Sequence, residues 1–117
     1  LNETKKIHMQ KKDLSRENLI EFSILFIMIF FGGAVKNNLE SISTIEFSNP
    51  ENEKFKIFLI DLIKSDMTEK EIKNKVLKTY SSLSKIIIEN SNLRMIVNKK
   101  NYDQIKELFE DFTNDLL

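Results

Sequence analysis

The sequence lacks cysteine and tryptophan and contains only two glycines, one proline and one histidine among its 117 residues. Without cysteine, the chain has no disulfide bond, no thiolate metal ligand and no cysteine nucleophile. The two glycines, Gly32 and Gly33, are adjacent, whereas phosphate loops and dinucleotide-binding fingerprints need several glycines at set spacings. These absences exclude thiol chemistry and the common glycine-rich nucleotide sites.

Catalytic and metal-binding motifs are also missing from the sequence. His8 is the only histidine and lies in a polar N-terminal segment, so no firmly held Ser-His-Asp arrangement is expected. HExxH, CxxC and calcium-loop patterns do not occur. We therefore predict that the protein is not an enzyme and has no catalytic residues, metal ligands or cofactor.

Charge and hydrophobicity are those of a single globular domain. Eighteen basic residues balance eighteen acidic ones, which argues against a nucleic-acid-binding domain, since these are usually strongly cationic. Hydrophobic residues make up 41% of the chain, which is sufficient for a core at this length. We expect a flexible polar arm at 1–12 and one helical domain at 13–117.

The longest uncharged stretch is FSILFIMIFFGGAV at residues 22–35. A membrane span is disfavoured because a helix of this length extends about 21 Å, against a hydrocarbon thickness of about 30 Å, and because Glu21 precedes the run. An export signal is disfavoured because its leader would be long and would carry several acidic residues. The preferred interpretation is an interior helix that is apolar on nearly all sides and is surrounded by protein.

Apolar residues recur at helical spacing along the rest of the chain and predict an all-α fold. We expect a compact bundle of five or six helices around a central apolar helix at about residues 15–31. No segment shows the sustained alternation that is typical of a strand. The other helices are predicted at about 34–47, 50–64, 68–89, 93–97 and 101–117.

Capping residues mark the ends of these helices. Asp13 or Ser15 is expected to cap the first helix, and Gly32 and Gly33 are expected to end it, because a helix end commonly needs a positive φ that glycine adopts without steric cost. Three further pairs mark helix starts: Asn49 with Pro50, Thr68 with Glu71, and Asn101 with Gln104.

The central helix and the helix at 50–64 carry wide apolar surfaces. In the second of these, Ile57 and Ile60 extend the apolar face well beyond a narrow stripe. Because a short chain has little other surface with which to cover both helices, we predict a homodimer.

Charge is unevenly distributed in the second half of the chain. Residues 70–100 contain eight basic and two acidic side chains, and residues 101–117 contain one basic and five acidic ones. One interpretation is that a basic helix and an acidic helix lie side by side and pair at the surface. The other is that Lys70, Lys78 and Lys85 form a basic strip on one side of a continuous helix. Such a strip would bind a glycan or an acidic protein partner, and nucleic acid is the least favoured ligand.

The arm LNETKKIHMQKK and the segments TEKEIKNKVLKTY and NYDQIKELFEDF stand in a Lys/Asn/Ile-rich chain without cysteine. In this respect the chain resembles the mature part of plasmid-type surface lipoproteins from Lyme and relapsing-fever (borrelial) spirochaetes. The resemblance implies a helical ectodomain that is tethered by a lipidated cysteine upstream of the arm. Many proteins of this group bind host proteins or have no assigned role. A chain that starts at Leu1 rather than Met is expected if such an anchor precedes it.

We therefore expect a lipid-anchored interaction domain at the cell surface that binds a host or partner macromolecule. The alternative is a cytoplasmic helical adaptor or inhibitor of a phage, plasmid or virus, and a third hypothesis is a carrier of an apolar ligand. A signal peptide with a lipobox cysteine upstream of Leu1 would support the first hypothesis, and an initiator Met there would support the second.

Overall fold

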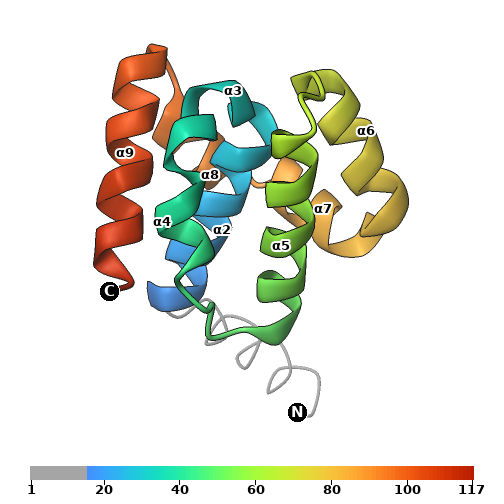
Figure 1. The fold of residues 1–117 in the computed structure, drawn as a ribbon, viewed down its shortest axis with the longest axis horizontal. Helices are drawn as coiled ribbons and strands as arrows, with labels where there is room; N and C mark the ends of the chain where they lie inside the picture. Colours follow the sequence, from blue (N-terminus) through green and yellow to red (C-terminus); the bar gives the residue numbers. More distant parts are fainter. Residues whose placement is uncertain (1–15) are drawn as a thin grey trace.

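The computed structural model describes residues 16–117, and every regular element in this range is helical. The prediction of an all-α bundle is therefore confirmed (Figure 1). The elements in chain order are α2 (Arg16–Phe30), α3 (Gly32–Val35), the 3-10 helix η1 (Lys36–Asn38), α4 (Leu39–Ser43), α5 (Pro50–Lys64), α6 (Glu69–Thr79), α7 (Ser81–Ile88), α8 (Ser91–Val97) and α9 (Tyr102–Asp115).

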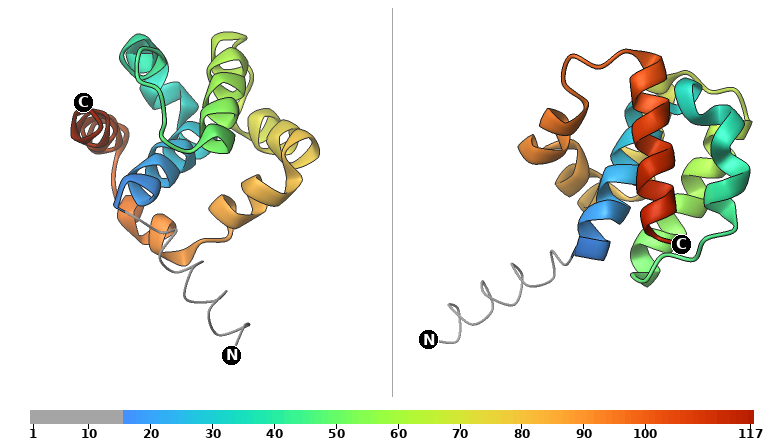
Figure 2. Two further views of the ribbon diagram at one scale, coloured as in Figure 1. Left: turned by 90° about the horizontal axis from the view of Figure 1, so that it is seen from below. Right: turned by 90° about the vertical axis from the view of Figure 1, so that its left-hand side faces the viewer.

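The apolar helix α2 lies at the centre of the bundle. Helices α4 and α5 lie in front of it, α7 and α8 lie behind it, and α9 and α6 lie on opposite sides (Figures 1 and 2). Every residue from Ile20 to Ile29 is buried. A helix that is apolar around its whole circumference needs protein on every side, and these neighbours supply it.

No single helix among residues 16–117 is long and apolar enough to cross a membrane. The stretches Arg16–Phe30 and Gly32–Ser43 have that length and composition only together, and they are bent by 108° at their junction.

The prediction that Gly32 and Gly33 end the central helix with a positive φ is wrong. Neither glycine has a positive φ, and both begin α3, while the chain turns at Phe31, whose φ is −133° and ψ 37°. Gly32 serves a packing purpose instead, since a Cβ atom at this position would lie 3.1 Å from Cγ1 of Ile63 on α5. The small residue allows the backbone of α3 to pass close to α5.

The helix predicted at 34–47 is formed by three short pieces, α3, η1 and α4. Its four apolar positions are buried as the spacing predicted, but regular helix ends at Ser43. These positions are Val35, Leu39, Ile42 and Ile45.

The helix predicted at 68–89 is divided at Tyr80, whose φ is −127° and ψ 58°. The Tyr80 ring stacks on Phe55 at a centroid distance of 5.3 Å and packs at 5.2 Å against Phe58. These contacts hold the turn against α5 and direct α7 back towards α2, which it contacts. Because two of the predicted helices are divided, the bundle contains more and shorter helices than the five or six that we expected.

Most predicted caps are confirmed. Asn49 accepts hydrogen bonds from the backbone of α5, and Thr68 with Glu71 and Asn101 with Gln104 both form reciprocal capping boxes. The predicted caps Asp13 and Ser15, the arm at 1–12 and His8 lie outside the described residues.

The apolar surfaces that suggested a homodimer are largely covered within one chain. Helix α2 is buried from Ile20 to Ile29, and Ile60 is buried, whereas Ile57 is 52% exposed. Ile57 therefore extends the apolar face of α5 into the solvent-exposed surface. The homodimer stays a prediction. Because α2 is covered within one chain, an exposed central helix no longer supports it.

Candidate functional site

The residues of the predicted basic strip occupy two helices. Lys70 and Lys78 are exposed on α6, and Lys85 is exposed on α7, beyond the turn at Tyr80. Lys70 and Lys78 still share a side of α6, since eight residues advance a helix by about 80° beyond whole turns. The continuous helix that aligned Lys85 with them does not exist, and a binding role for the three lysines stays a prediction.

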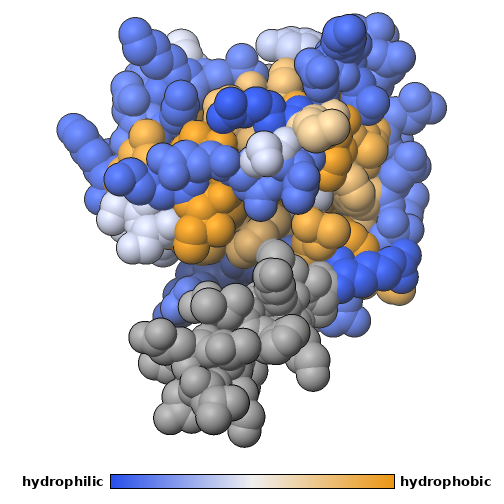
Figure 3. Space-filling model, turned by 180° about the vertical axis from the view of Figure 1, so that it is seen from behind, coloured by the Kyte–Doolittle hydropathy of each residue, from blue (hydrophilic) through white to orange (hydrophobic). Residues whose placement is uncertain are grey.

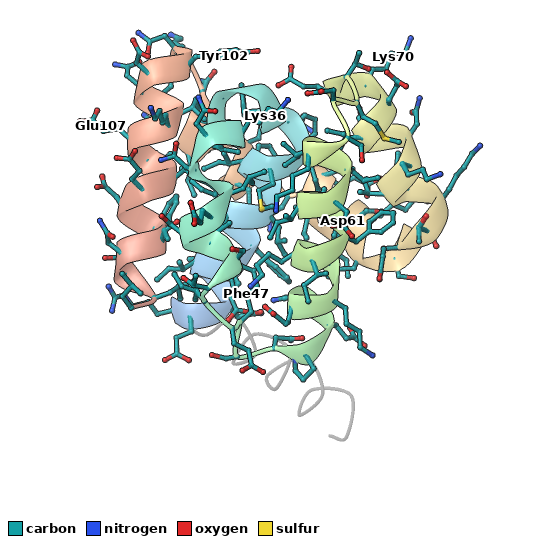
Figure 4. The ribbon with its side chains drawn as sticks, in the orientation of Figure 1. Lys36, Phe47, Asp61, Lys70, Tyr102 and Glu107 are labelled. Atoms are coloured by element: carbon teal, nitrogen blue, oxygen red, sulfur yellow. The ribbon has the colours of Figure 1, made fainter. Side chains whose placement is uncertain are left out.

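The acidic helix α9 is not the neighbour of the basic helix α6. The two helices lie at opposite sides of the bundle (Figures 1 and 2), and α9 packs against α2 and α3. Figure 4 shows Glu107 on the outer side of α9 and Lys70 at the far side of the molecule. The interpretation that these helices pair through their charges is therefore wrong, and both faces are available to solvent.

A cleft of about 240 Å³ opens between α2, α6, α7 and α8, and we call it the α2/α8 cleft. Its lining is apolar except for two cationic side chains. The lining residues are Phe26, Phe30, Phe31, Lys73, Ile88, Arg94 and Val97.

Aromatic side chains form one wall of the α2/α8 cleft. Phe26 and Phe30 pack with ring centroids 4.6 Å apart, and Phe31 meets Tyr102 edge-on at 6.3 Å. Tyr102 is 56% exposed and extends the aromatic surface towards the start of α9. Figure 3, which views the molecule from behind, shows hydrophobic side chains gathered across the centre of this face, with hydrophilic ones around them.

The two cations of the cleft are placed differently. The Lys73 ammonium lies 5.6 Å from the centroid of the Phe30 ring, a cation–π geometry. Arg94 donates from Nη2 to the carbonyl oxygen of Ile88 at 3.2 Å. Neither side chain forms an ion pair with another residue of 16–117.

A larger hollow of about 420 Å³ lies beside the turn between α6 and α7. It is lined by Glu51, Lys54 and residues 79–83. Charges of both signs lie on its lining, and Tyr80, its only aromatic residue, is already stacked on Phe55. The hollow therefore offers no chemical preference for a ligand, and the α2/α8 cleft is the better candidate site.

A group of buried polar side chains lies at the other end of α2. The Glu21 carboxylate accepts from Nδ2 of Asn52 at 3.0 Å and from the backbone N–H of Ser48 at 2.7 Å. Asn52 also donates to Oδ1 of Asn18 at 2.9 Å. Glu21 and Asn52 are both buried, so these bonds satisfy groups that would otherwise be costly to bury.

Lys56 forms the second part of this buried group. Its ammonium donates to the carbonyl oxygen of Ile45 and lies 2.7 Å from Oε1 of Glu53 and 4.9 Å from the Phe47 ring centroid. Figure 4 places Phe47 between the lower ends of α4 and α5. The hydrogen-bond partners of Glu21, Asn52 and Lys56 are thus all residues of the chain itself. Since no buried polar atom of this group is left free for a ligand, we assign the group a structural role.

The structure holds no metal-binding arrangement within residues 16–117, because no three His, Asp or Glu side chains of this range converge suitably.

The sequence did not identify the α2/α8 cleft. Phe30 and Phe31 belong to the uncharged run that was assigned to the interior, and Lys73 and Arg94 were only two of eight basic residues in 70–100. The cleft joins residues of α2 with residues more than forty positions away, and no short-range pattern encodes such a meeting.

Comparison with known proteins finds no family, no characterised protein and no solved structure that matches the chain.

Proposed function

We propose that this chain is a non-enzymatic interaction domain that binds a protein partner by receiving one of its apolar side chains in the α2/α8 cleft. The observation that carries the proposal is the cleft itself, an apolar surface hollow with one aromatic wall and two cations that form no ion pair within residues 16–117. Arginine, tyrosine and tryptophan most often dominate the energy of protein interfaces, and here Arg94 lines the cleft while the exposed Tyr102 packs against Phe31.

The size of the cleft favours a protein partner over a small apolar ligand. Pockets for drug-sized ligands usually measure about 300 to 1,000 Å³ and enclose most of the ligand, whereas this cleft measures about 240 Å³. A cleft of this size suits a single anchor side chain of a protein partner, while the rest of the partner contacts the surface around the cleft. The carrier hypothesis predicts a lipid that co-purifies with the chain, which mass spectrometry would detect.

For the whole protein, we propose the ectodomain of a lipid-anchored surface protein, with a cytoplasmic adaptor or inhibitor as the alternative. The support for the first is the composition and the segments that resemble spirochaetal surface lipoproteins. The gene sequence upstream of Leu1 distinguishes the two, since a signal peptide with a lipobox cysteine supports the ectodomain and an initiator Met supports the adaptor.

The binding role can be tested by selecting a displayed library of random twelve-residue peptides on the immobilised chain. We expect selected peptides to shift the amide resonances of α8 and of the α2 C-terminus in NMR spectra, and Phe30→Ala to weaken their binding at least about tenfold. Met95→Ala is the matched control, because Met95 lies on α8, is 72% exposed and does not line the cleft. Circular dichroism would verify that both variants remain folded.

The proposal is wrong if no peptide is selected, or if the selected peptides bind wild type and the Phe30→Ala variant equally well.

A further inference from the structure

We infer that the α2/α8 cleft recognises an acidic hydrophobic segment, in which an aromatic or branched aliphatic anchor stands within two residues of an Asp or Glu. This inference rests on the proposed function and adds the chemical class of the partner. It is argued from the placement of Lys73 and Arg94 around an apolar lining that contains no acidic residue.

Lys73 supplies a cation that is held against the apolar wall. Its ammonium lies 5.6 Å from the Phe30 centroid, and the residue is only half-exposed. A carboxylate that arrives beside an anchor packed on Phe30 would meet this charge in a partly desolvated setting, where charge pairs are stronger than in open water.

Arg94 supplies a directional donor. A guanidinium carries five N–H groups in a fixed plane, and the one that bonds to the Ile88 carbonyl at 3.2 Å orients this plane at the edge of the cleft. The remaining N–H groups suit the two oxygens of a carboxylate, which arginine commonly binds through paired hydrogen bonds. Val97, one helical turn along α8, lines the cleft beside Arg94.

No carboxylate lines the α2/α8 cleft itself, and the Glu69 carboxylate lies outside the lining, at the Tyr102 hydroxyl. No described acidic side chain pairs with Lys73 or Arg94, and the acidic side of α9 lies on a different flank of the bundle (Figures 1 and 2). A cation next to an apolar surface disfavours basic partners and favours acidic ones, so the cleft selects by charge as well as by shape.

The experiment uses the full chain and the peptides selected from the random library. We expect Asp or Glu to be enriched within two positions of the apolar anchor. Replacement of that acid by Asn or Gln in a synthetic copy of the peptide should weaken binding about tenfold, as expected for a well-placed charge pair. The Arg94→Gln variant should show a similar loss, and the Lys73→Gln variant a loss of about threefold, because a lysine forms a less directional contact.

Lys85→Gln and Lys78→Gln are the matched controls, since both residues are exposed and lie outside the cleft lining. We expect these variants to bind the peptide as wild type does. A loss in the controls that equals the loss in Arg94→Gln would overturn the inference and assign the acid to the predicted basic strip.

Failure of this inference differs from failure of the proposed function. Peptides that bind in the cleft through an anchor alone, with no acid enrichment and no effect of Arg94→Gln, would overturn the inference and leave the binding role intact. Peptides that bind outside the cleft would overturn both the inference and the proposed function. The same conclusion would follow if no peptide bound at all.

Discussion

At the scale of single residues, the least expected feature is the burial of charged groups next to the apolar core. Glu21 and Lys56 are each 1% exposed, although charged side chains are almost never fully buried unless they are paired. Both make bonds to the segment that joins α4 to α5, through Ser48 and Ile45. Since buried charges are tolerated only with such partners, these bonds fix a connection that has no regular structure of its own.

The substitution Lys56→Met tests this role. Met has a similar length but leaves the Ile45 carbonyl without its donor and Glu53 without its cation. We expect the free energy of unfolding to fall by about 2 to 3 kcal/mol, because a buried acceptor and a carboxylate lose their partner. Urea denaturation would measure the change.

Lys54→Met is the control for this substitution. Lys54 lies on the same helix but is exposed, so we expect its replacement to change stability by less than about 0.5 kcal/mol. Equal effects of the two substitutions would contradict a structural role for the buried ammonium.

At the scale of elements, the architecture depends on two turns, at Phe31 and at Tyr80. The break at Phe31 is followed directly by Gly32 and Gly33, which predicted a helix end there, whereas no glycine or proline signals the break at Tyr80. At the first turn, α3 approaches α5 through Gly32. At the second, the Tyr80 ring is held between Phe55 and Phe58 of α5. In both cases residues of α5 pack against the turn.

Alanine substitution of the two adjacent glycines should have effects of opposite sign. A Cβ at Gly33 meets no atom within 4 Å, and alanine favours a helix over glycine, so Gly33→Ala should stabilise the protein by about 0.5 to 1 kcal/mol. A Cβ at Gly32 would lie 3.1 Å from the buried Ile63 side chain. We expect Gly32→Ala to destabilise the protein by about 1 kcal/mol, because crowding exceeds the gain in helix propensity.

Thermal and urea denaturation of the two variants measure this difference. Destabilisation by both would contradict the free space around Gly33, whereas stabilisation by both would show that the Ile63 side chain can move aside.

At the scale of the whole molecule, α2 divides a basic flank, which contains α6, from an acidic flank, which contains α9. One direct polar contact still joins the starts of these two helices, since the Tyr102 hydroxyl lies 3.5 Å from Oε1 of Glu69. Burial raises the pKa of the Glu69 carboxyl above its usual value, and the hydrogen bond with Tyr102 opposes this effect in part. Oε2 of Glu69 is buried and has no partner among the described residues.

This pKa shift predicts a pH dependence of stability. A carboxyl whose pKa is higher in the folded state than in the unfolded one favours folding when it is protonated, and this contribution is lost as the pH rises through the folded value. We therefore expect the stability of Glu69→Gln relative to wild type to be greatest near pH 7 and to decrease as the pH falls towards 4.

Urea denaturation at a series of pH values measures this difference, and Glu107→Gln on the outer side of α9 (Figure 4) controls for the loss of a carboxylate as such. A difference in stability between Glu69→Gln and wild type that does not change with pH would contradict a raised pKa of Glu69 in the folded protein.

The sequence by itself determined the helical class, the interior position of residues 22–29 and the starts of α5, α6 and α9, because these depend on local periodicity and on caps that act within four residues. Asn49, Thr68 and Asn101 cap their helices as predicted. Only the tertiary structure decided the direction of the chain after Phe31, the turn at Tyr80, the burial of Glu21 and Lys56, the separation of α6 from α9, and the α2/α8 cleft. Each of these depends on contacts between side chains that are distant in the sequence, and the free energy of such contacts exceeds the local preferences that a short stretch of sequence expresses.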